Sequence, residues 1–136
     1  MQATLKSSVT FEGVGLHAGQ PATMVVRPAL AGSGIVFRRM DIAGDAGRLP
    51  AMWDMVEVSP LNTRLRNAQG TTVSTIEHVM AALAGCGIHN AFIELDGPEV
   101  PIMDGSSAVF VRGFVKAGLV ELDMRMQAIE MVDDVT

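Results

Sequence analysis

The stretch STIEHVMAALAGCGIHNAFIEL, residues 74–95, decides the fold because a helical pattern changes into a strand pattern within it. Its first apolar residues recur at intervals of three and four, which is the spacing of one face of an α-helix. These residues are Ile76, Val79, Met80 and Leu83. Gly85 is expected to end the helix, since glycine readily adopts the conformation that closes a helical C-terminus. Residues 90–95, NAFIEL, then predict a short strand.

Before this stretch the chain has the features of β-strands, namely β-branched residues and partial alternation of apolar and polar side chains. The predicted strands are residues 3–11, 22–28, 34–39, 53–58, 62–66 and 71–73. The first two are expected to pair in antiparallel fashion across a glycine-rich bend, and the last two are expected to form a hairpin.

After the NAFIEL strand, a loop containing proline and glycine leads to Ser106 and Ser107, and either serine is suited to cap a helix. A second helix is predicted over residues 108–117, with its two phenylalanines facing the core and Gly118 as its stop. Strands followed by helix, strand and helix predict an α+β fold. We expect a two-layer sandwich in which two helices cover one face of a mainly antiparallel or mixed sheet.

The composition bounds the class of protein. With 136 residues, of which 49% are hydrophobic, the chain is expected to form one domain. It has no apolar run near the roughly 20 residues of a membrane span, and its N-terminus lacks the pattern of a signal peptide. Cys86 is the single cysteine, which fits a reducing compartment, so a soluble, cytoplasmic protein is predicted. The net charge of −5 and the scattered arginines argue against a nucleic-acid partner.

The side of the first predicted helix opposite its apolar stripe carries one acid, one imidazole and two small residues, which are Glu77, His78, Ala81 and Ala82. Because a water-exposed side would carry longer polar residues, another protein layer or a ligand is expected there. An adjacent Glu-His pair at a helix start could supply a general base beside a metal ligand. The spacing of Ser74 and Glu77 is equally that of a capping box, in which Glu77 would only satisfy a backbone N–H.

Three further polar residues are weaker candidates. His17 lies in the turn GVGLHAG, where it could face the same cleft as His78 or be an ordinary turn residue. Asp104 precedes the second helix and is read as a turn and cap residue, with the orientation of a group in a cleft as the alternative. His89 has no acidic or histidine neighbour at ligand spacing and is predicted to be structural.

Four stretches together resemble one protein family. They are GVGLHAG (13–19), GIVFRR (34–39), STIEHVMAALAGCGIHNAFIEL (74–95) and PIMDGSSAVFV (101–111). In this order and spacing they look like the first domain of UDP-3-O-acyl-N-acetylglucosamine deacetylase. The resemblance covers residues 1–122. Residues 123–136, which include a strand-like segment at 127–132, resemble the start of the connection to a second domain that is absent here.

The resemblance implies a two-lobed zinc enzyme that removes the N-acetyl group from a UDP-linked, 3-O-acylated glucosamine in bacterial lipid A biosynthesis. By motif match, His78 corresponds to one of three protein ligands of the zinc, and Glu77 to the acid that activates the water. Leu61, Asn62 and Thr63 correspond to a segment beside the metal that contacts the substrate. Zinc with three protein ligands keeps a position for water, lowers its pKa and polarises the amide carbonyl.

The other two zinc ligands, a His and an Asp, belong to the family's second domain, as do the oxyanion histidine, the lysine near the phosphates and most of the acyl-chain tunnel. The chain is therefore expected to be a half-site, inactive without a complementary lobe. Two alternatives stay open. The chain could be a non-catalytic homologue that binds a nucleotide sugar or the full-length enzyme, or a homodimer in which two Glu77-His78 helices form an improvised metal site.

Overall fold

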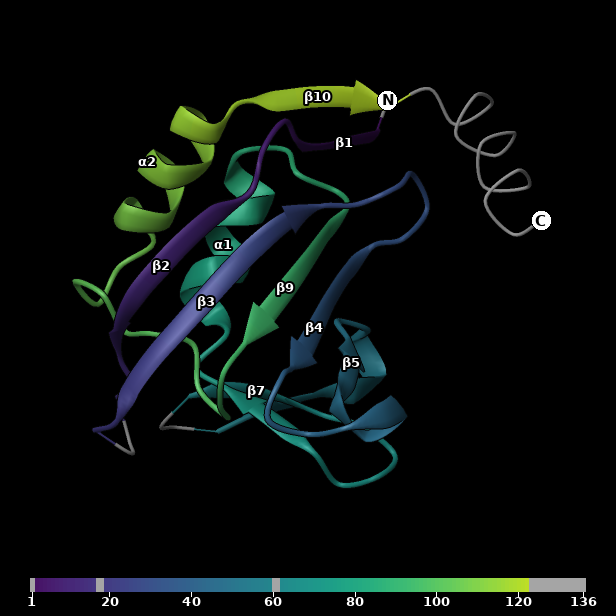
Figure 1. The fold of residues 1–136 in the computed structure, drawn as a ribbon, viewed down its shortest axis with the longest axis vertical. Helices are drawn as coiled ribbons and strands as arrows, with labels where there is room; N and C mark the ends of the chain where they lie inside the picture. Colours follow the sequence, from purple (N-terminus) through teal and green to yellow (C-terminus); the bar gives the residue numbers. More distant parts are fainter. Residues whose placement is uncertain (1, 17–18, 60–61, 123–136) are drawn as a thin grey trace.

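The structure is a computed structural model, and it describes residues 2–16, 19–59 and 62–122 (Figure 1). Within these residues the strands form three sheets, and the largest has five strands. In spatial order these are β2 (Val9–Val14), β3 (Pro21–Pro28), β9 (Ala91–Leu95), β4 (Ile35–Arg39) and β5 (Arg48–Pro50). The β4–β9 pair is parallel and the other pairs are antiparallel, so the sheet is mixed, as predicted.

One face of this sheet is buried beneath two helices, α1 (Glu77–Gly85) and α2 (Ala108–Ala117), which pack against each other; in Figure 1 α1 lies behind the strands and α2 to the left of β2. Every second residue of β3 points to the buried face, where Met24 and Val26 are fully enclosed. Both helices end where predicted and α2 also begins where predicted, whereas α1 begins at Glu77 and not next to Ser74, as the capping-box spacing implied. The α+β sandwich expected from the sequence is therefore confirmed.

Helix α2 is fixed to the sheet by aromatic packing. Phe110 and Phe114 are fully buried, and the ring of Phe11 from β2 meets them edge-on at centroid distances of 4.9 and 5.8 Å. Each buried phenylalanine contributes roughly 1.5–3 kcal/mol of burial free energy. Gly113 leaves room for the Phe11 ring, since a Cβ at this position would lie 2.6 Å from the ring edge.

The second sheet carries the segment that leads into α1. It consists of β6 (Val56–Val58), β7 (Thr63–Arg66) and β8 (Thr72–Ser74), all antiparallel, which confirms the predicted hairpin. The buried Asn67 in the β7–β8 turn donates from Nδ2 to the carbonyls of Ala46 and Arg48, at 2.9 and 3.1 Å. Arg39 at the end of β4 donates to the carbonyl of Thr72 at 3.2 Å. The hairpin is thus fastened to the edge of the main sheet.

Two strand predictions need correction. The predicted strand at 3–11 is two strands, because β1 (Gln2–Leu5) leaves the main sheet and pairs with β10 (Leu119–Leu122). This pairing arises because Gly118, with φ of 86°, turns the chain after α2 so that its carbonyl accepts from the amide of Lys6 at 2.8 Å. The predicted strand at 53–58 is extended only in β6, since Trp53–Met55 form a 3₁₀ turn, η2. A second short 3₁₀ turn, η1, spans Gly44–Gly47.

The predicted connection at 123–136 and the strand-like segment within it lie outside the described residues. Among the helices that the structure does describe, none is long and apolar enough to cross a bilayer.

Candidate active site

The Glu-His pair occupies the first turn of α1. Glu77 is the first residue of the helix and His78 the second, and both side chains are half-buried. The hairpin β7–β8 leads into this turn, because β8 ends at Ser74 and two residues join it to the helix. The pair is therefore held where the second sheet meets the helix layer.

One oxygen of the Glu77 carboxylate accepts a hydrogen bond, and the other has no hydrogen-bond partner among the described residues. The amide of Thr63 donates to Glu77 Oε2 at 3.3 Å, and the carbonyl of Thr63 accepts from the amide of Ile76 at 3.1 Å. Glu77 Oε1 is buried and has no hydrogen-bond partner among the described residues. A buried polar atom without a partner costs about 1–3 kcal/mol. In folded proteins such an atom is explained by a catalytic role, by a bound ion or by an ordered water.

The capping-box interpretation of Ser74 and Glu77 is wrong. A capping box needs the serine at the N-cap and the glutamate at the third helical position, whereas Ile76 is the N-cap and no side chain caps the helix. Ser74 belongs instead to β8, where its amide donates to the Pro98 carbonyl at 2.8 Å. The Glu77 carboxylate is therefore free of the helix backbone.

Thr75, between β8 and the helix, adopts φ of 64°. A β-branched residue rarely takes a left-handed conformation, and such strain costs on the order of 1–3 kcal/mol. Its hydroxyl donates to Glu99 Oε2 at 3.4 Å, and both residues are buried. Neither residue was singled out from the sequence. No local pattern marks Thr75, and Glu99 lies in the predicted loop without a motif that distinguishes it.

Ala81 and Ala82, which were predicted to face another protein layer or a ligand, have different surroundings in the structure. Ala81 is exposed, but Ala82 is completely buried within the core. Because α2 packs against α1, the helix is buried over a wider arc than a single apolar stripe. The small-residue side of α1 therefore faces another protein layer at Ala82 and is open at Ala81.

The remaining predicted residues are distributed over the molecule. His17 and Leu61 lie outside the described residues, while Asn62 and Thr63 are half-buried at the start of β7. His89 is exposed, and its Nδ1 accepts from the amide of Ala3 at 3.0 Å, which ties β1 to the segment before β9 and confirms a structural role.

Asp104 is exposed and forms a turn before α2. Its Oδ1 accepts from the amide and from the hydroxyl of Ser106, at 3.0 and 2.8 Å, and the Ser106 hydroxyl in turn accepts from the amide of Ala108 at 3.2 Å. The hydrogen bond from the Ser106 hydroxyl, followed by that from its amide, lowers the pKa of Asp104. These bonds agree with the turn-and-cap interpretation; Ser107 occupies the N-cap position without a capping bond, and Ser106 accepts from the first helical amide instead.

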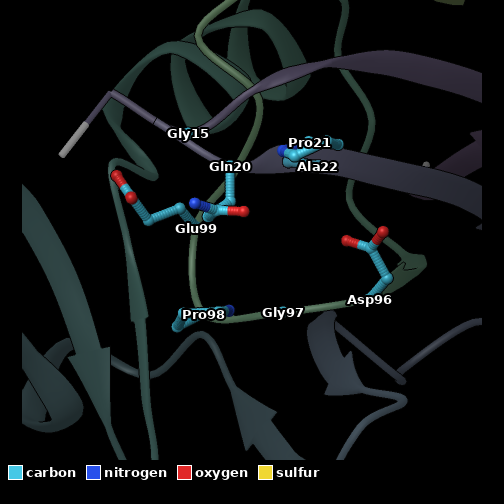
Figure 2. A pocket seen from close by; sticks show the side chains of 8 residues that line it. All are labelled: Gly15, Gln20, Pro21, Ala22, Asp96, Gly97, Pro98 and Glu99. Atoms are coloured by element: carbon cyan, nitrogen blue, oxygen red, sulfur yellow. The ribbon is translucent and has the colours of Figure 1, made fainter. Parts of the chain in front are cut away.

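A small pocket lies near the loop that carries Glu99. Residues 96–99 form one wall and the start of β3 forms the other, as Figure 2 shows. Its volume of about 30 Å³ leaves room for ordered water. In Figure 2 the Glu99 side chain extends away from Asp96. A pocket of this size in the described part of the chain does not accommodate a nucleotide sugar.

The donor groups near Glu77 suit part of a metal site. His78 offers an imidazole as a ligand, and the adjacent residue Glu77 offers the carboxylate oxygen Oε1, which has no partner among the described residues. Within residues 2–16, 19–59 and 62–122 no three side chains of His, Cys, Asp or Glu lie close enough together to hold a metal ion. The residues described here therefore fit one ligand and a base, and a complete zinc site requires further ligands.

Comparisons with known proteins agree with the resemblance found in the sequence. The family model of UDP-3-O-acyl N-acetylglycosamine deacetylase matches residues 2–136. Among curated relatives named UDP-3-O-acyl-N-acetylglucosamine deacetylase, the one from Citrifermentans bemidjiense is 52% identical over 87% of this chain. The relatives from Aliivibrio fischeri and Phenylobacterium zucineum are 48% and 47% identical over 90% and 96% of it. The matched region spans 38%, 40% and 45% of the lengths of these three relatives, in the same order.

Proposed function

The chain belongs to the UDP-3-O-acyl N-acetylglycosamine deacetylase family, and from this membership we propose that it forms the first lobe of a zinc-dependent deacetylase. Its substrate is UDP-3-O-acyl-N-acetylglucosamine, from which the whole enzyme removes the N-acetyl group during lipid A biosynthesis in the bacterial cytoplasm. Residues 1–122 make up the lobe, and residues 123–136 begin the connection to a second lobe. The coverage of about two fifths of each relative supports this division.

Glu77 carries the proposal, because one of its oxygens is fixed and the other has no partner among the described residues. The Thr63 amide holds Oε2 and so orients the carboxylate without occupying its second oxygen. Oε1 is then the proton acceptor. As a general base Glu77 takes a proton from the water that attacks the amide, and it returns this proton to the leaving amine.

His78 is proposed as one of the zinc ligands, beside the base on the same helical turn. Zinc, when bound, supplies Lewis-acid polarisation of the amide carbonyl and lowers the pKa of water. We infer that the second lobe contributes the remaining ligands, as the family resemblance implies, and among the described residues no three candidate side chains are close enough to hold a metal ion. The isolated chain is consequently expected to be inactive.

We propose that Leu61, Asn62 and Thr63 contact the substrate, and the hydrogen bonds of Thr63 indicate which of its groups are available for this. Its amide is engaged by Glu77 and its carbonyl by the amide of Ile76. The backbone of Thr63 therefore positions the base, and contacts to the substrate fall to its side chain and to the residues before it. Asp104 and His17 have no assigned part in this mechanism.

Complementation tests the proposal. The chain is combined with the remaining part of the Phenylobacterium zucineum relative, which is 47% identical over the shared region, and acetate release from UDP-3-O-acyl-N-acetylglucosamine is measured with and without zinc. We expect turnover that a chelator abolishes and that the isolated chain lacks. Native mass spectrometry should show zinc in the complex and its loss in His78→Ala. A complex with full zinc occupancy and no turnover would contradict the proposal.

The same complex tests the alternative of a non-catalytic binding module. Ala81 is exposed beside the pair, so Ala81→Trp blocks this surface without entering the core, whereas a large residue at the buried Ala82 would disturb packing. A binding module predicts that Glu77→Gln leaves function intact and Ala81→Trp abolishes it. A deacetylase predicts that Glu77→Gln abolishes turnover while the complex still forms.

A further inference from the structure

The strained residue before α1 controls the direction in which the helix leaves the hairpin. Thr75 has φ of 64° and is followed by Ile76 and Glu77. Glycine or asparagine adopts this conformation at much smaller cost than a β-branched residue. If Thr75 returned to an ordinary φ, the backbone would leave Ser74 in another direction, and both Glu77 and His78 would move. Something must therefore hold Thr75 in place.

Residues 98–100 fix the backbone next to Thr75 through hydrogen bonds to Ser74. The amide of Ser74 donates to the carbonyl of Pro98 at 2.8 Å, and the amide of Val100 donates to the carbonyl of Ser74 at 3.1 Å. Ser74 is thus hydrogen-bonded to the residues immediately before and after Glu99, and the two segments form a parallel β-bridge at Ser74 and Glu99. The residue before the strained position is fixed by a segment that lies 24 residues later in the sequence.

The side chain of Glu99 contacts Thr75 itself through a hydrogen bond. Glu99 is 6% exposed and Thr75 is 2% exposed, and the threonine hydroxyl donates to Glu99 Oε2 at 3.4 Å. The carboxylate is confined from the opposite side by Gly15, because a Cβ there would lie 2.7 Å from Glu99 Oε1. The end of β2 and the start of α1 therefore enclose the Glu99 carboxylate between them.

We propose that Glu99 is a positioning residue that holds Thr75 in its left-handed conformation and thereby sets the place of Glu77 and His78. This inference rests on the proposed function for its catalytic consequence. Its structural part is independent of that function, since the contact between the Thr63 amide and Glu77 Oε2 reports whether the helix start is in place. In this proposal Glu99 acts through Thr75.

Backbone amide exchange on this chain tests the structural part. In Glu99→Ala we expect the amides of Thr63 and Ile76 to exchange about tenfold faster relative to the amides of β3, a factor that corresponds to about 1.4 kcal/mol. Thr75→Val replaces the hydroxyl with a methyl group of similar size and should have the same effect, so it serves as the test if Glu99→Ala does not fold. Unchanged exchange at Thr63 and Ile76 in the folded variants would overturn the proposal.

A rescue variant separates positioning from general loss of stability. Because glycine needs no support at positive φ, Thr75→Gly should restore slow exchange at Thr63 in the Glu99→Ala background, although the volume lost at Glu99 remains. In the complemented enzyme the same double variant should recover the kcat that Glu99→Ala lowers about tenfold, with KM unchanged in both. A double variant that behaves like Glu99→Ala would contradict the positioning role.

Failure of the proposed function gives a different result. In that case Glu77→Gln leaves turnover of the complemented enzyme unchanged, while amide exchange at Thr63 still follows the state of Glu99 and Thr75.

Discussion

Helices α1 and α2 lie side by side on the same face of the sheet, but the segments that lead into them are built differently (Figure 1). Before α2, Asp104 bonds to Ser106, and Ser106 bonds to the first amide of the helix, so the polar groups are satisfied by close neighbours. Before α1, no side chain caps the helix, Thr75 is strained, and Glu77 Oε1 is buried without a partner among the described residues.

The comparison indicates that the segment before α2 serves stability, whereas the segment before α1 has the features of a functional site. Met103 also has a positive φ, of 54°, but it is unbranched and lies five residues before α2. The turn before α2 is local and exposed, whereas the one before α1 depends on partners from β7 and from the segment 98–100. Strain and unsatisfied groups persist where the surrounding structure fixes them, and they concentrate at functional sites.

The largest effect is expected at the start of α1, and it concerns activity. Glu77→Gln keeps the shape of the side chain and an acceptor for the Thr63 amide but removes the proton acceptor. In the complemented enzyme kcat should fall about 10²–10⁴-fold, while the melting temperature of the chain is unchanged or higher because a buried charge is lost. Steady-state kinetics and calorimetry measure the two quantities. Glu121→Gln, exposed on β10, should alter neither.

The next largest effect is expected within α2, and it concerns stability. Phe110→Ala removes a fully buried ring that meets Phe11 edge-on, and the free energy of unfolding should fall by about 3–5 kcal/mol. Val115→Ala on the exposed side of the same helix should change it by less than about 0.5 kcal/mol. Denaturant unfolding of both variants gives the comparison. Equal losses would show that α2 is not fixed through its aromatic side.

A smaller effect is expected at the turn before α2. Ser106→Ala removes the side chain that accepts from the Ala108 amide, and it should cost about 1 kcal/mol of unfolding free energy. Ser107→Ala is the matched control, because Ser107 occupies the N-cap position but makes no capping bond. Thermal denaturation of the two variants distinguishes them. A loss at Ser107 in place of Ser106 would reverse the assignment of the cap.

The smallest effect is expected in the pH dependence of this turn. Hydrogen bonds from Ser106 lower the pKa of Asp104 below its ordinary value of 3.8, so the folded state favours the ionised carboxylate. The stabilisation is present above pH 3.8 and is lost as the pH falls through the lower pKa of the folded state. The difference in melting temperature between the wild type and Asp104→Ala should shrink over this acidic range. In the Ser106→Ala background the same difference should be smaller above pH 3.8, where the carboxylate is ionised.

Much of the candidate site follows from local sequence. The Glu-His pair at a helix start, the apolar stripe of α1 and the bounds of α2 were predicted, because side-chain periodicity and glycine stops act over a few residues. Whether a protein layer or a ligand covers Ala82 could not be decided from the helical pattern of α1, because the burial of Ala82 depends on α2. The splitting of the first predicted strand likewise depends on the turn at Gly118, more than 100 residues away.

The amino-acid sequence by itself determined the α+β class, the helix that carries Glu77 and His78, and the resemblance to a deacetylase family. Only the tertiary structure decided that the Glu77 carboxylate bonds to Thr63 and not to its own helix, and that Thr75 is held in a left-handed conformation beside Glu99. The physical reason is the range of the interactions. Periodicity acts between neighbours in the chain, whereas the partner of a buried carboxylate is set by whichever backbone the packed sheets bring beside it.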